Sequence, residues 1–260
     1  MLKVEIVKAD VSAKKFQKMK DYVAEEKPLR IFLNKSHHAT LLCSPSNLKE
    51  LAIGHLLSEG IVKSIEEIEE IHIKAEGACY VKLKPGINLK ARLKISTPFS
   101  RVILSACGNL SPFQYSGRFP KITSNLNVEA EVILNGVNRL NSIAMTFRKT
   151  GGVHVAAIYR SNGNLVAFAE DVGRHNTVDK AIGIGALNKT DFGECFLALS
   201  GRLTGDIVIK AARVGLPIVA SLAAAIDSGI AVARDVGLTL IGFVRGKRMN
   251  IYNFPERILP

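Results

Sequence analysis

Hydrophobic and polar residues follow one pattern before residue 125 and another after it. Early in the chain, "LRIFLNKSHHATLLCS" alternates apolar residues on both sides of a turn, which predicts two paired strands with His37 and His38 in the turn. The following "SNLKELAIGHLLSEGIV" predicts a helix with Asn47 as N-cap and Glu50 three residues later. We interpret residues 1–124 as a smaller α+β domain.

From residue 125 onward, strands alternate with helices. "VEAEVILNGVNRLNSIAMTFRKT" predicts a helix, and "GGVHVAAIYR" and "NLVAFAEDV" predict strands about a turn. Buried strands such as "CFLALSG" and "PIVASL" then alternate with amphipathic helices up to "RMNIYN". This order predicts an α/β domain over residues 125–260, with a mixed sheet covered by helices on both faces.

Three polar clusters fall where this sheet would expose them. "EDVGRHN" and "SGRLTGD" each lie between a strand and a helix, and "FVRGKR" ends a strand. Ligands of α/β sheets bind beyond the carboxyl ends of strands, where helix N-termini present N–H groups to anions, so the clusters predict one anion site. The structural alternative is that Asp171 and Asn176 cap a helix and Arg174 pairs with an acid.

Composition limits the classes of protein to be considered. The 260 residues are 47% hydrophobic, and the formal charge of +12 favours either an anionic partner or a solvated basic surface. The first residues resemble neither a secretory signal nor a membrane anchor, so we expect a cytoplasmic location without a membrane partner. The four cysteines are widely spaced, without a CxxC pair, so neither disulfides nor a cysteine-rich zinc site is expected.

An enzymatic alternative can be compared with the helix starts. Zinc-dependent deaminases place HxE at one helix start and PCxxC at the next. The corresponding starts here are "RHNTVD" and "SGRLTGD", which lack the glutamate and both cysteines. We therefore expect neither deamination nor zinc.

Several stretches together resemble one family. These are "ELAIGHLLSEGIV", "TGGVHVAAI", "EDVGRHNTVDKAIG", "SGRLTGDIVIKAARVGLPIVAS" and "LTLIGFVRGKRMNIY". In this order they resemble the formate dehydrogenase accessory proteins of the FdhD family. The resemblance implies a cytidine-deaminase-like α/β domain behind the smaller N-terminal domain, and a homodimer.

The resemblance also implies a function. Members of the family are thought to take sulfur from a cysteine desulfurase as a persulfide and pass it to bis(molybdopterin guanine dinucleotide) molybdenum cofactor for formate dehydrogenase. Their persulfide cysteine opens a CGxCG motif, which Cys107 matches in "CGNLS", whereas Leu110 and Ser111 replace the second cysteine and the last glycine. One cysteine suffices to hold a persulfide. The cysteines in apolar strand-like runs are expected in the core: Cys43, Cys79 and Cys195.

The cofactor contacts are also implied by the resemblance. The resemblance implies that the basic "FVRGKR" contacts the guanine dinucleotide end of the cofactor. We interpret "EDVGRHN" as the wall of a nucleotide pocket that GDP-like nucleotides would also occupy. For His154 the alternative is a core histidine, and for Gly151 and Gly152 a tight turn. The expected cofactor-binding residues are Phe243, Val244, Arg245, Gly246, Lys247, Arg248, Glu170, Asp171, Arg174, His175, Gly151, Gly152 and His154.

Two alternative functions stay open. A cofactor-binding chaperone without sulfur transfer is favoured by Leu110 in place of the second motif cysteine. A nucleic-acid-binding protein is favoured by the charge, but the sequence has no aromatic-rich stacking surface or known binding motif. We therefore expect no nucleic-acid partner.

Overall fold

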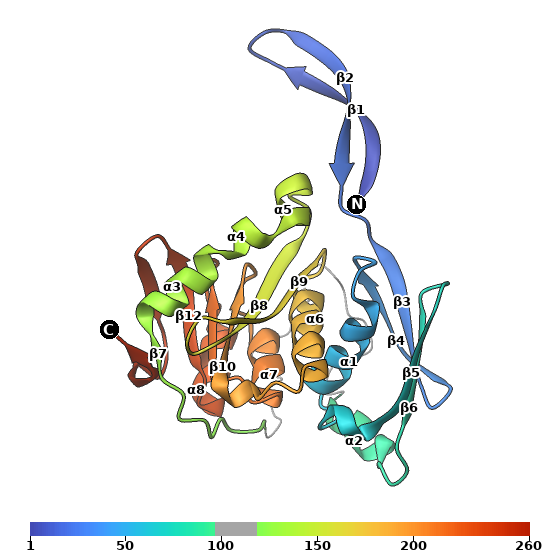
Figure 1. Ribbon diagram of the computed structural model, residues 1–260, viewed down its shortest axis with the longest axis vertical. Coiled ribbons are helices and arrows are strands. Elements are labelled where there is room, and N and C mark those ends of the chain that lie inside the picture. The colour runs from blue at the N-terminus through green and yellow to red at the C-terminus, as the bar shows by residue number, and fades with distance from the viewer. Residues whose placement is uncertain (97–118) are drawn as a thin grey trace.

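The computed structural model describes residues 1–96 and 119–260 (Figure 1). It contains a projecting hairpin, a four-stranded sheet and a larger six-stranded sheet. No helix in these two stretches is both long and apolar enough to cross a bilayer. Cys107, Leu110 and Ser111 lie outside the described residues.

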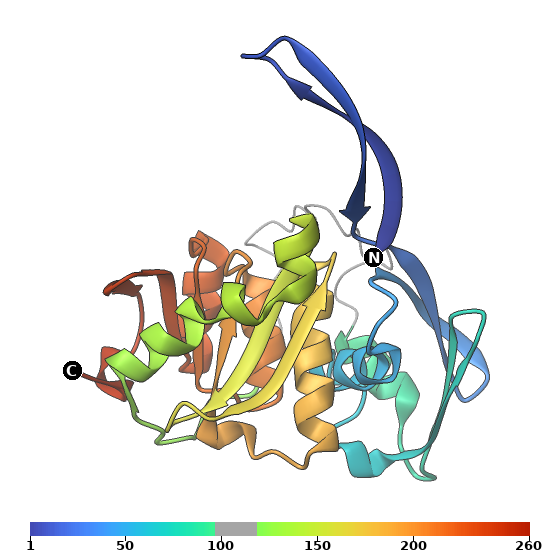
Figure 2. The same cartoon turned by 45° about the horizontal axis from the view of Figure 1, so that its top comes forward.

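The chain begins with a hairpin that the sequence pattern did not predict. β1 (Leu2–Asp10) pairs antiparallel with β2 (Lys15–Val23), and the ribbon extends away from the rest of the molecule in both views (Figures 1 and 2). Apolar and charged residues alternate from Leu2 to Ile6 as in a half-buried strand, but the alternation is lost in β2, so the pattern does not show two paired strands.

The predicted strand pair belongs to a four-stranded sheet with the order β4-β3-β6-β5. Its strands are β3 (Lys27–Leu33), β4 (Ser36–Cys43), β5 (Ile68–Lys74) and β6 (Ala78–Leu83). The turn is at Asn34 and Lys35, which both have positive φ, so the placement of His37 and His38 in it was wrong, and they lie in β4.

The helix predicted after this pair is α1 (Leu48–Ser58), and Asn47 is its N-cap residue, as predicted. Asn47 precedes it in the left-handed region, with φ of 52°, and makes no side-chain cap hydrogen bond within the described chain. The predicted position of the N-cap is therefore confirmed, whereas side-chain capping by Asn47 is not seen, because a residue that caps with its side chain normally has extended backbone. Contacts of its buried face therefore hold α1 in place.

The larger sheet has the order β13-β12-β11-β10-β8-β9, in which β8 and β13 run opposite to the other strands. The strands are β8 (His154–Arg160), β9 (Leu165–Asp171), β10 (Cys195–Leu199), β11 (Ile218–Ser221), β12 (Thr239–Arg245) and β13 (Arg248–Ile251). Most positions of β8, β10, β11 and β12 are buried, as expected for strands covered on both sides.

Helices cover both faces of this sheet. One face packs against α6 (Arg174–Leu187), α7 (Gly205–Arg213) and α8 (Asp227–Val236). The other packs against the segment predicted as one helix, which is broken into α3 (Ala130–Asn138), α4 (Leu140–Ile143) and α5 (Met145–Thr150). The prediction of a mixed sheet with helices on both faces is confirmed, whereas a deaminase-like layering and a boundary at residue 124 stay predictions.

The smaller sheet joins the larger one through close packing of α1 on α6 (Figure 1). A Cβ at Gly54 would overlap the Asp179 carbonyl, and a Cβ at Gly183 would overlap the Glu50 carbonyl. Glycine thus lets the two helix backbones approach closely, and one apolar core runs from the first sheet into the second. The shorter elements are α2 (Leu89–Ser96), β7 (Val128–Glu129), β14 (Ile258–Leu259), η1 (Ile65–Glu67), η3 (Phe192–Glu194) and η4 (Pro255–Arg257).

Candidate functional site

The three polar clusters lie at one edge of the six-stranded sheet, as predicted. β9, β10, β11 and β12 run in the same direction, so their carboxyl ends meet at this edge, together with the amino end of β8. α6, α7 and α8 begin at the same edge because each follows one of these strands. A ligand at this edge would face loops and helix starts rather than the core.

Asp171 is the most buried residue of the "EDVGRHN" cluster, and its carboxylate binds only neighbouring protein groups. It forms an ion pair of 2.6 Å with Lys180, and both side chains are 0% exposed. Its oxygens also accept the N–H of Ser44 and Gly173 and the amide of Asn176. The geometry therefore favours the structural alternative for Asp171, although Gly173 rather than Asp171 is the N-cap of α6.

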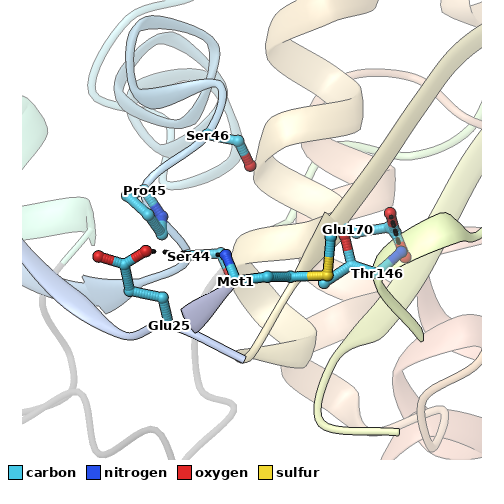
Figure 3. A pocket seen from close by; sticks show the side chains of 7 residues that line it. All are labelled: Met1, Glu25, Ser44, Pro45, Ser46, Thr146 and Glu170. Atoms are coloured by element: carbon cyan, nitrogen blue, oxygen red, sulfur yellow. Dashed lines mark hydrogen bonds and ion pairs between the residues drawn. The ribbon is translucent and has the colours of Figure 1, made fainter. Parts of the chain in front are cut away.

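Glu170 points to the opposite side of β9, where it holds the start of α5. Its two carboxylate oxygens accept the backbone N–H groups of Thr146, at 3.1 Å, and Phe147, at 2.7 Å. Figure 3 shows Glu170 and Thr146 together at one end of a small cavity of about 140 Å³, with Met1, Glu25, Ser44, Pro45 and Ser46 around it. This volume is below that of the usual small-molecule pocket.

Arg174 provides the strongest sign of a missing anionic partner. Its buried Nε has no hydrogen-bond partner among the residues that the structure describes. A buried guanidinium N–H without an acceptor is costly, so a ligand oxygen is its expected partner. The structural alternative for Arg174 was an ion pair with an acid. The described ion pairs of this cluster do not include one.

His154 lies beside Arg174 as an uncharged hydrogen-bonding group. It is half-buried, and its Nδ1 is 3.4 Å from the Ser200 hydroxyl, which accepts the Val155 N–H. Burial, followed by the positive charges of Arg174 and His175, lowers the pKa of the His154 imidazole. At neutral pH His154 is therefore the neutral form, which both donates and accepts hydrogen bonds.

His175 is held by a pair of residues that the sequence reasoning did not single out. Its Nε2 hydrogen-bonds the carboxylate of Asp206, which also accepts the Thr204 hydroxyl. Burial opposes ionisation of Asp206, but the hydrogen bond and charge of His175 outweigh it and lower the pKa of the carboxyl. The sequence signal that could have singled out Asp206 was "TGD" at the start of α7. An acid in the first turn of a helix is favoured by the helix dipole.

The end of β12 combines exposed basic residues with unusual backbone. Phe243 has a φ of 51° at a bulge and is 40% exposed, and Gly246 has a φ of 58° in the turn before β13. Arg245 donates to the Leu222 carbonyl, and Lys247 and Arg248 are exposed. Val244 is 0% exposed and packs in the core, so its side chain faces away from any ligand at this edge.

Gly151 and Gly152 form the turn between α5 and β8, which is the structural alternative for them. Gly151 ends α5 in the left-handed region, with φ of 63°, and its N–H donates to Phe147. A Cβ on Gly152 would lie 3.0 Å from that of Ala24, close to the base of the hairpin. Both glycines are exposed, so backbone contact with a ligand stays a prediction.

The candidate site is elongated. Three strand spacings separate β8 from β12, which places the start of β8, at His154, about 14 Å from the basic end of β12. Two backbone N–H groups in the first turn of α7 already have acceptors within the protein, since Gly205 donates to the Ser228 hydroxyl and Ile207 to the Asp206 carboxylate. Side-chain cations at both ends therefore carry the attraction for an extended, multiply charged anion.

A second buried polar cluster lies between α1, α6 and α7. Lys210 binds Asp179 at 3.0 Å and Glu59 at 2.8 Å, and Asp179 also accepts the Ser58 hydroxyl. Burial opposes both charges, but their mutual attraction outweighs it, lowering the pKa of Asp179 and raising that of Lys210. These ions are satisfied by one another, so the cluster fixes helix packing and leaves no group for a ligand.

The three cysteines expected in the core are there. Cys43, Cys79 and Cys195 are each 0% exposed. Burial raises the pKa of Cys43 and of Cys79 to about 12 and that of Cys195 to about 11. Their thiols are therefore protonated at neutral pH, and poor nucleophiles.

The protein is expected to hold no zinc. Among the described residues, no three or more histidine, cysteine or acidic side chains are grouped as metal ligands would be. We expect elemental analysis to find no stoichiometric zinc, and EDTA to leave the unfolding midpoint unchanged. One zinc per chain, retained during purification and lost with the folded state, would contradict this expectation.

Comparisons with known proteins give consistent results. A family model described as the FdhD/NarQ family matches residues 24–259. Two proteins named sulfur carrier protein FdhD are similar to this chain. That of Sulfolobus acidocaldarius is 37% identical, and the match covers 92% of this chain and 91% of the relative. That of Methanothermobacter thermautotrophicus is 38% identical, and the match covers 94% of each. A crystal structure of a candidate formate dehydrogenase accessory protein from Desulfotalea psychrophila matches with a TM-score of 0.80 at 28% identity, covering 99% of both chains.

Proposed function

The chain belongs to the FdhD/NarQ family, and on this premise we propose that it is a cytoplasmic sulfur carrier for formate dehydrogenase. In this proposal Cys107 accepts sulfur as a persulfide from a cysteine desulfurase. The sulfur is then transferred to bis(molybdopterin guanine dinucleotide) molybdenum cofactor, which is the substrate.

The observation that carries the proposal is the burial of every described cysteine. Cys43, Cys79 and Cys195 are 0% exposed, and burial raises the pKa of each thiol. A sulfur carrier needs a thiolate that a donor protein can reach. Cys107 is the remaining cysteine of the sequence, and it matches the first cysteine of the family motif.

Loading and delivery are two sulfur transfers. The Cys107 thiolate attacks the outer sulfur of the desulfurase persulfide, the S–S bond of the donor breaks, and the donor cysteine leaves as a thiolate. In delivery, a nucleophilic group of the acceptor attacks the outer sulfur on Cys107, and Cys107 leaves as a thiolate. The outer sulfur moves as a neutral atom in both steps, so neither step consumes an external oxidant or reductant.

Support for the cofactor as substrate comes from the sheet edge. The Arg174 Nε, which has no hydrogen-bond partner among the described residues, fits a phosphate oxygen, and Arg245, Lys247 and Arg248 add positive charge around the turn from β12 to β13. His175, held by Asp206, and the neutral His154 supply further hydrogen-bond donors between these ends. In this arrangement Phe243 and Gly246 contact the guanine dinucleotide end, and GDP-like nucleotides bind the same residues.

Arg174→Ala and Arg245→Ala are each expected to weaken GDP binding by roughly 1–3 kcal/mol, because each removes a charged hydrogen bond to phosphate. Isothermal titration calorimetry of the full chain measures the change. Arg160→Ala is the matched control, since Arg160 is an exposed arginine at the far end of β8. Equal affinity in wild type and both variants would remove this edge from the nucleotide site.

One alternative function has an observation in its favour. Leu110 stands where the family motif has its second cysteine, which would suit a chaperone that binds the cofactor without transferring sulfur. Such a chaperone would bind GDP and activate formate dehydrogenase after Cys107→Ala. A nucleic-acid-binding protein would instead bind random DNA or RNA in a salt-sensitive way and bind no guanine nucleotide.

A further inference from the structure

The Asp206 carboxylate decides which nitrogen of His175 carries a proton. Burial opposes the charge of Asp206, but the hydrogen bond and charge of His175 outweigh burial and hold the pKa of this carboxyl well below its usual range. An ionised carboxylate can only accept hydrogen bonds, so the His175 Nε2 is the donor in their contact. The Thr204 hydroxyl donates to the same carboxylate and holds it in place.

The second ring nitrogen of His175, Nδ1, is therefore the atom that gains or loses a proton. Nε2 is the only His175 ring nitrogen that has a hydrogen-bond partner among the residues that the structure describes. The neutral ring presents a lone pair at Nδ1, which repels a phosphate oxygen, whereas the charged ring presents an N–H there, which donates to it. Only the protonated form of His175 can thus bind an anion through Nδ1.

His175 shares the sheet edge with the side chain that lacks an acceptor, Arg174. The two residues are consecutive in the first turn of α6, and their charges both act on His154. The charge of Arg174 also acts on Asp206. A Cβ on Gly201 would lie 3.2 Å from the Arg174 Cβ, so Arg174 lies close to the loop after β10. An anion that accepts from the Arg174 Nε would therefore bind close to His175.

The groups whose charge bears on this proton come from several elements. They are Asp206 on α7, Arg174 on α6, His154 on β8, Asp171 at the end of β9 and Arg202 in the loop after β10. His154 is the rival for the proton, because it is also an imidazole at this edge. Burial, followed by the positive charges of Arg174 and His175, lowers the pKa of His154, and its Nδ1 is 3.4 Å from the Ser200 hydroxyl. His175, beside an ionised carboxylate, is the better proton acceptor.

We propose that His175 takes up a proton when an anion binds beside Arg174, and that Asp206 is the positioning residue that directs this proton to Nδ1. This proposal rests on the proposed function, because the anion is taken to be the diphosphate of a guanine dinucleotide. The proton comes from the solvent, forms the Nδ1–H bond and returns to the solvent when the ligand dissociates, so no bond of the ligand changes. Binding is therefore strongest at low pH, where His175 is already charged, and weakens as the pH rises.

Isothermal titration calorimetry of the full chain counts this proton when it is repeated in buffers of different ionisation enthalpy. The ligand is diguanosine diphosphate, in which a diphosphate joins two guanosines, because it lacks the terminal phosphate that titrates near neutral pH. Between about pH 6 and about pH 8.5, wild type should take up at least about half a proton per ligand at its maximum, and its affinity should fall about tenfold or more. His175→Gln, which cannot ionise, should take up none and bind about tenfold more weakly at about pH 6.

Three further variants assign the proton to its residue. Asp206→Asn should move the uptake to lower pH, because it removes the negative charge that attracts the charged ring, and a merely structural role of Asp206 would not move it. His154→Gln should keep the proton uptake. His72→Gln is the matched control, since His72 also lies beside a carboxylate, that of Glu70, but is 71% exposed on β5 and should leave both uptake and affinity unchanged. Circular dichroism checks that each variant is folded.

The outcomes separate this proposal from the function on which it rests. Wild type that binds the ligand without proton uptake, or uptake that persists in His175→Gln and is lost in His154→Gln, would overturn the proposal and leave the nucleotide site intact. Uptake at an unchanged pH in Asp206→Asn would overturn the positioning role of Asp206. Wild type that does not bind diguanosine diphosphate at any pH in this range would overturn both the nucleotide site and the proposal.

Discussion

Cys107→Ala is expected to abolish sulfur loading and the activation of formate dehydrogenase, while the protein stays folded. Under the proposed function the Cys107 sulfur is the only covalent attachment point for the cargo, so its loss cannot be compensated by residues that merely bind the cofactor. Loading is measured by mass after incubation with a cysteine desulfurase and cysteine, and activation by formate oxidation in cells lacking the native carrier.

Two further variants sharpen this prediction. Cys79→Ala is the matched control, because it also removes one thiol. The Cys79 thiol is buried and its pKa is raised to about 12, so sulfur loading should persist in this variant. Leu110→Cys restores the second cysteine of the family motif and should not be required for loading. Activation by Cys107→Ala at the wild-type level would show that Cys107 does not carry the sulfur.

Asp171→Ala is expected to destabilise the fold by about 3–5 kcal/mol. The change leaves the Lys180 ammonium buried without its counter-ion, and it leaves the N–H groups of Ser44 and Gly173 without an acceptor. Urea unfolding followed by circular dichroism measures the loss. The loss should make GDP binding difficult to interpret in this variant, so binding is better compared in Arg174→Ala.

The matched control for Asp171→Ala is Asp235→Ala. Asp235 also forms an ion pair, with Lys121, but both side chains are 62% exposed, so solvent screens the pair and replaces it easily. Its removal should change stability much less. Equal unfolding midpoints for Asp171→Ala and wild type would show that the buried Asp171–Lys180 pair does not stabilise the fold. Binding of a ligand by Asp171 would then be the better interpretation.

The sequence predicted the position of the site better than the roles of its residues. Polar clusters after consecutive strands must meet at one sheet edge if the strands are parallel, and "EDVGRHN", "SGRLTGD" and "FVRGKR" do so. The pattern does not show which way each side chain points. Asp171 turns into the core toward Lys180, and Val244 packs in the core between the sheet and α3, whereas the Arg174 Nε has no hydrogen-bond partner in the described chain.

Long-range contacts explain most of what the sequence could not predict. Asp206 positions His175 from 31 residues away, and Ser44, in the loop after β4, donates its N–H to Asp171, 127 residues away. The Lys180 ammonium is buried, and it donates to the carbonyls of Ser44, in the loop after β4, and of Glu170, in β9. The β1–β2 hairpin was missed because apolar and polar residues do not alternate along β2, although they do from Leu2 to Ile6 in β1.

The most direct test of the proposed function is peptide mass mapping of the wild-type chain after reaction with a cysteine desulfurase and cysteine. One added sulfur, about 32 Da, is predicted on the peptide that contains Cys107, and it should disappear on reduction. The peptides containing Cys43, Cys79 and Cys195 should keep their unmodified mass, because their thiols are buried. Sulfur on any of those three peptides, or no added sulfur on the Cys107 peptide while formate dehydrogenase is still activated, would contradict the sulfur-carrier function proposed for Cys107.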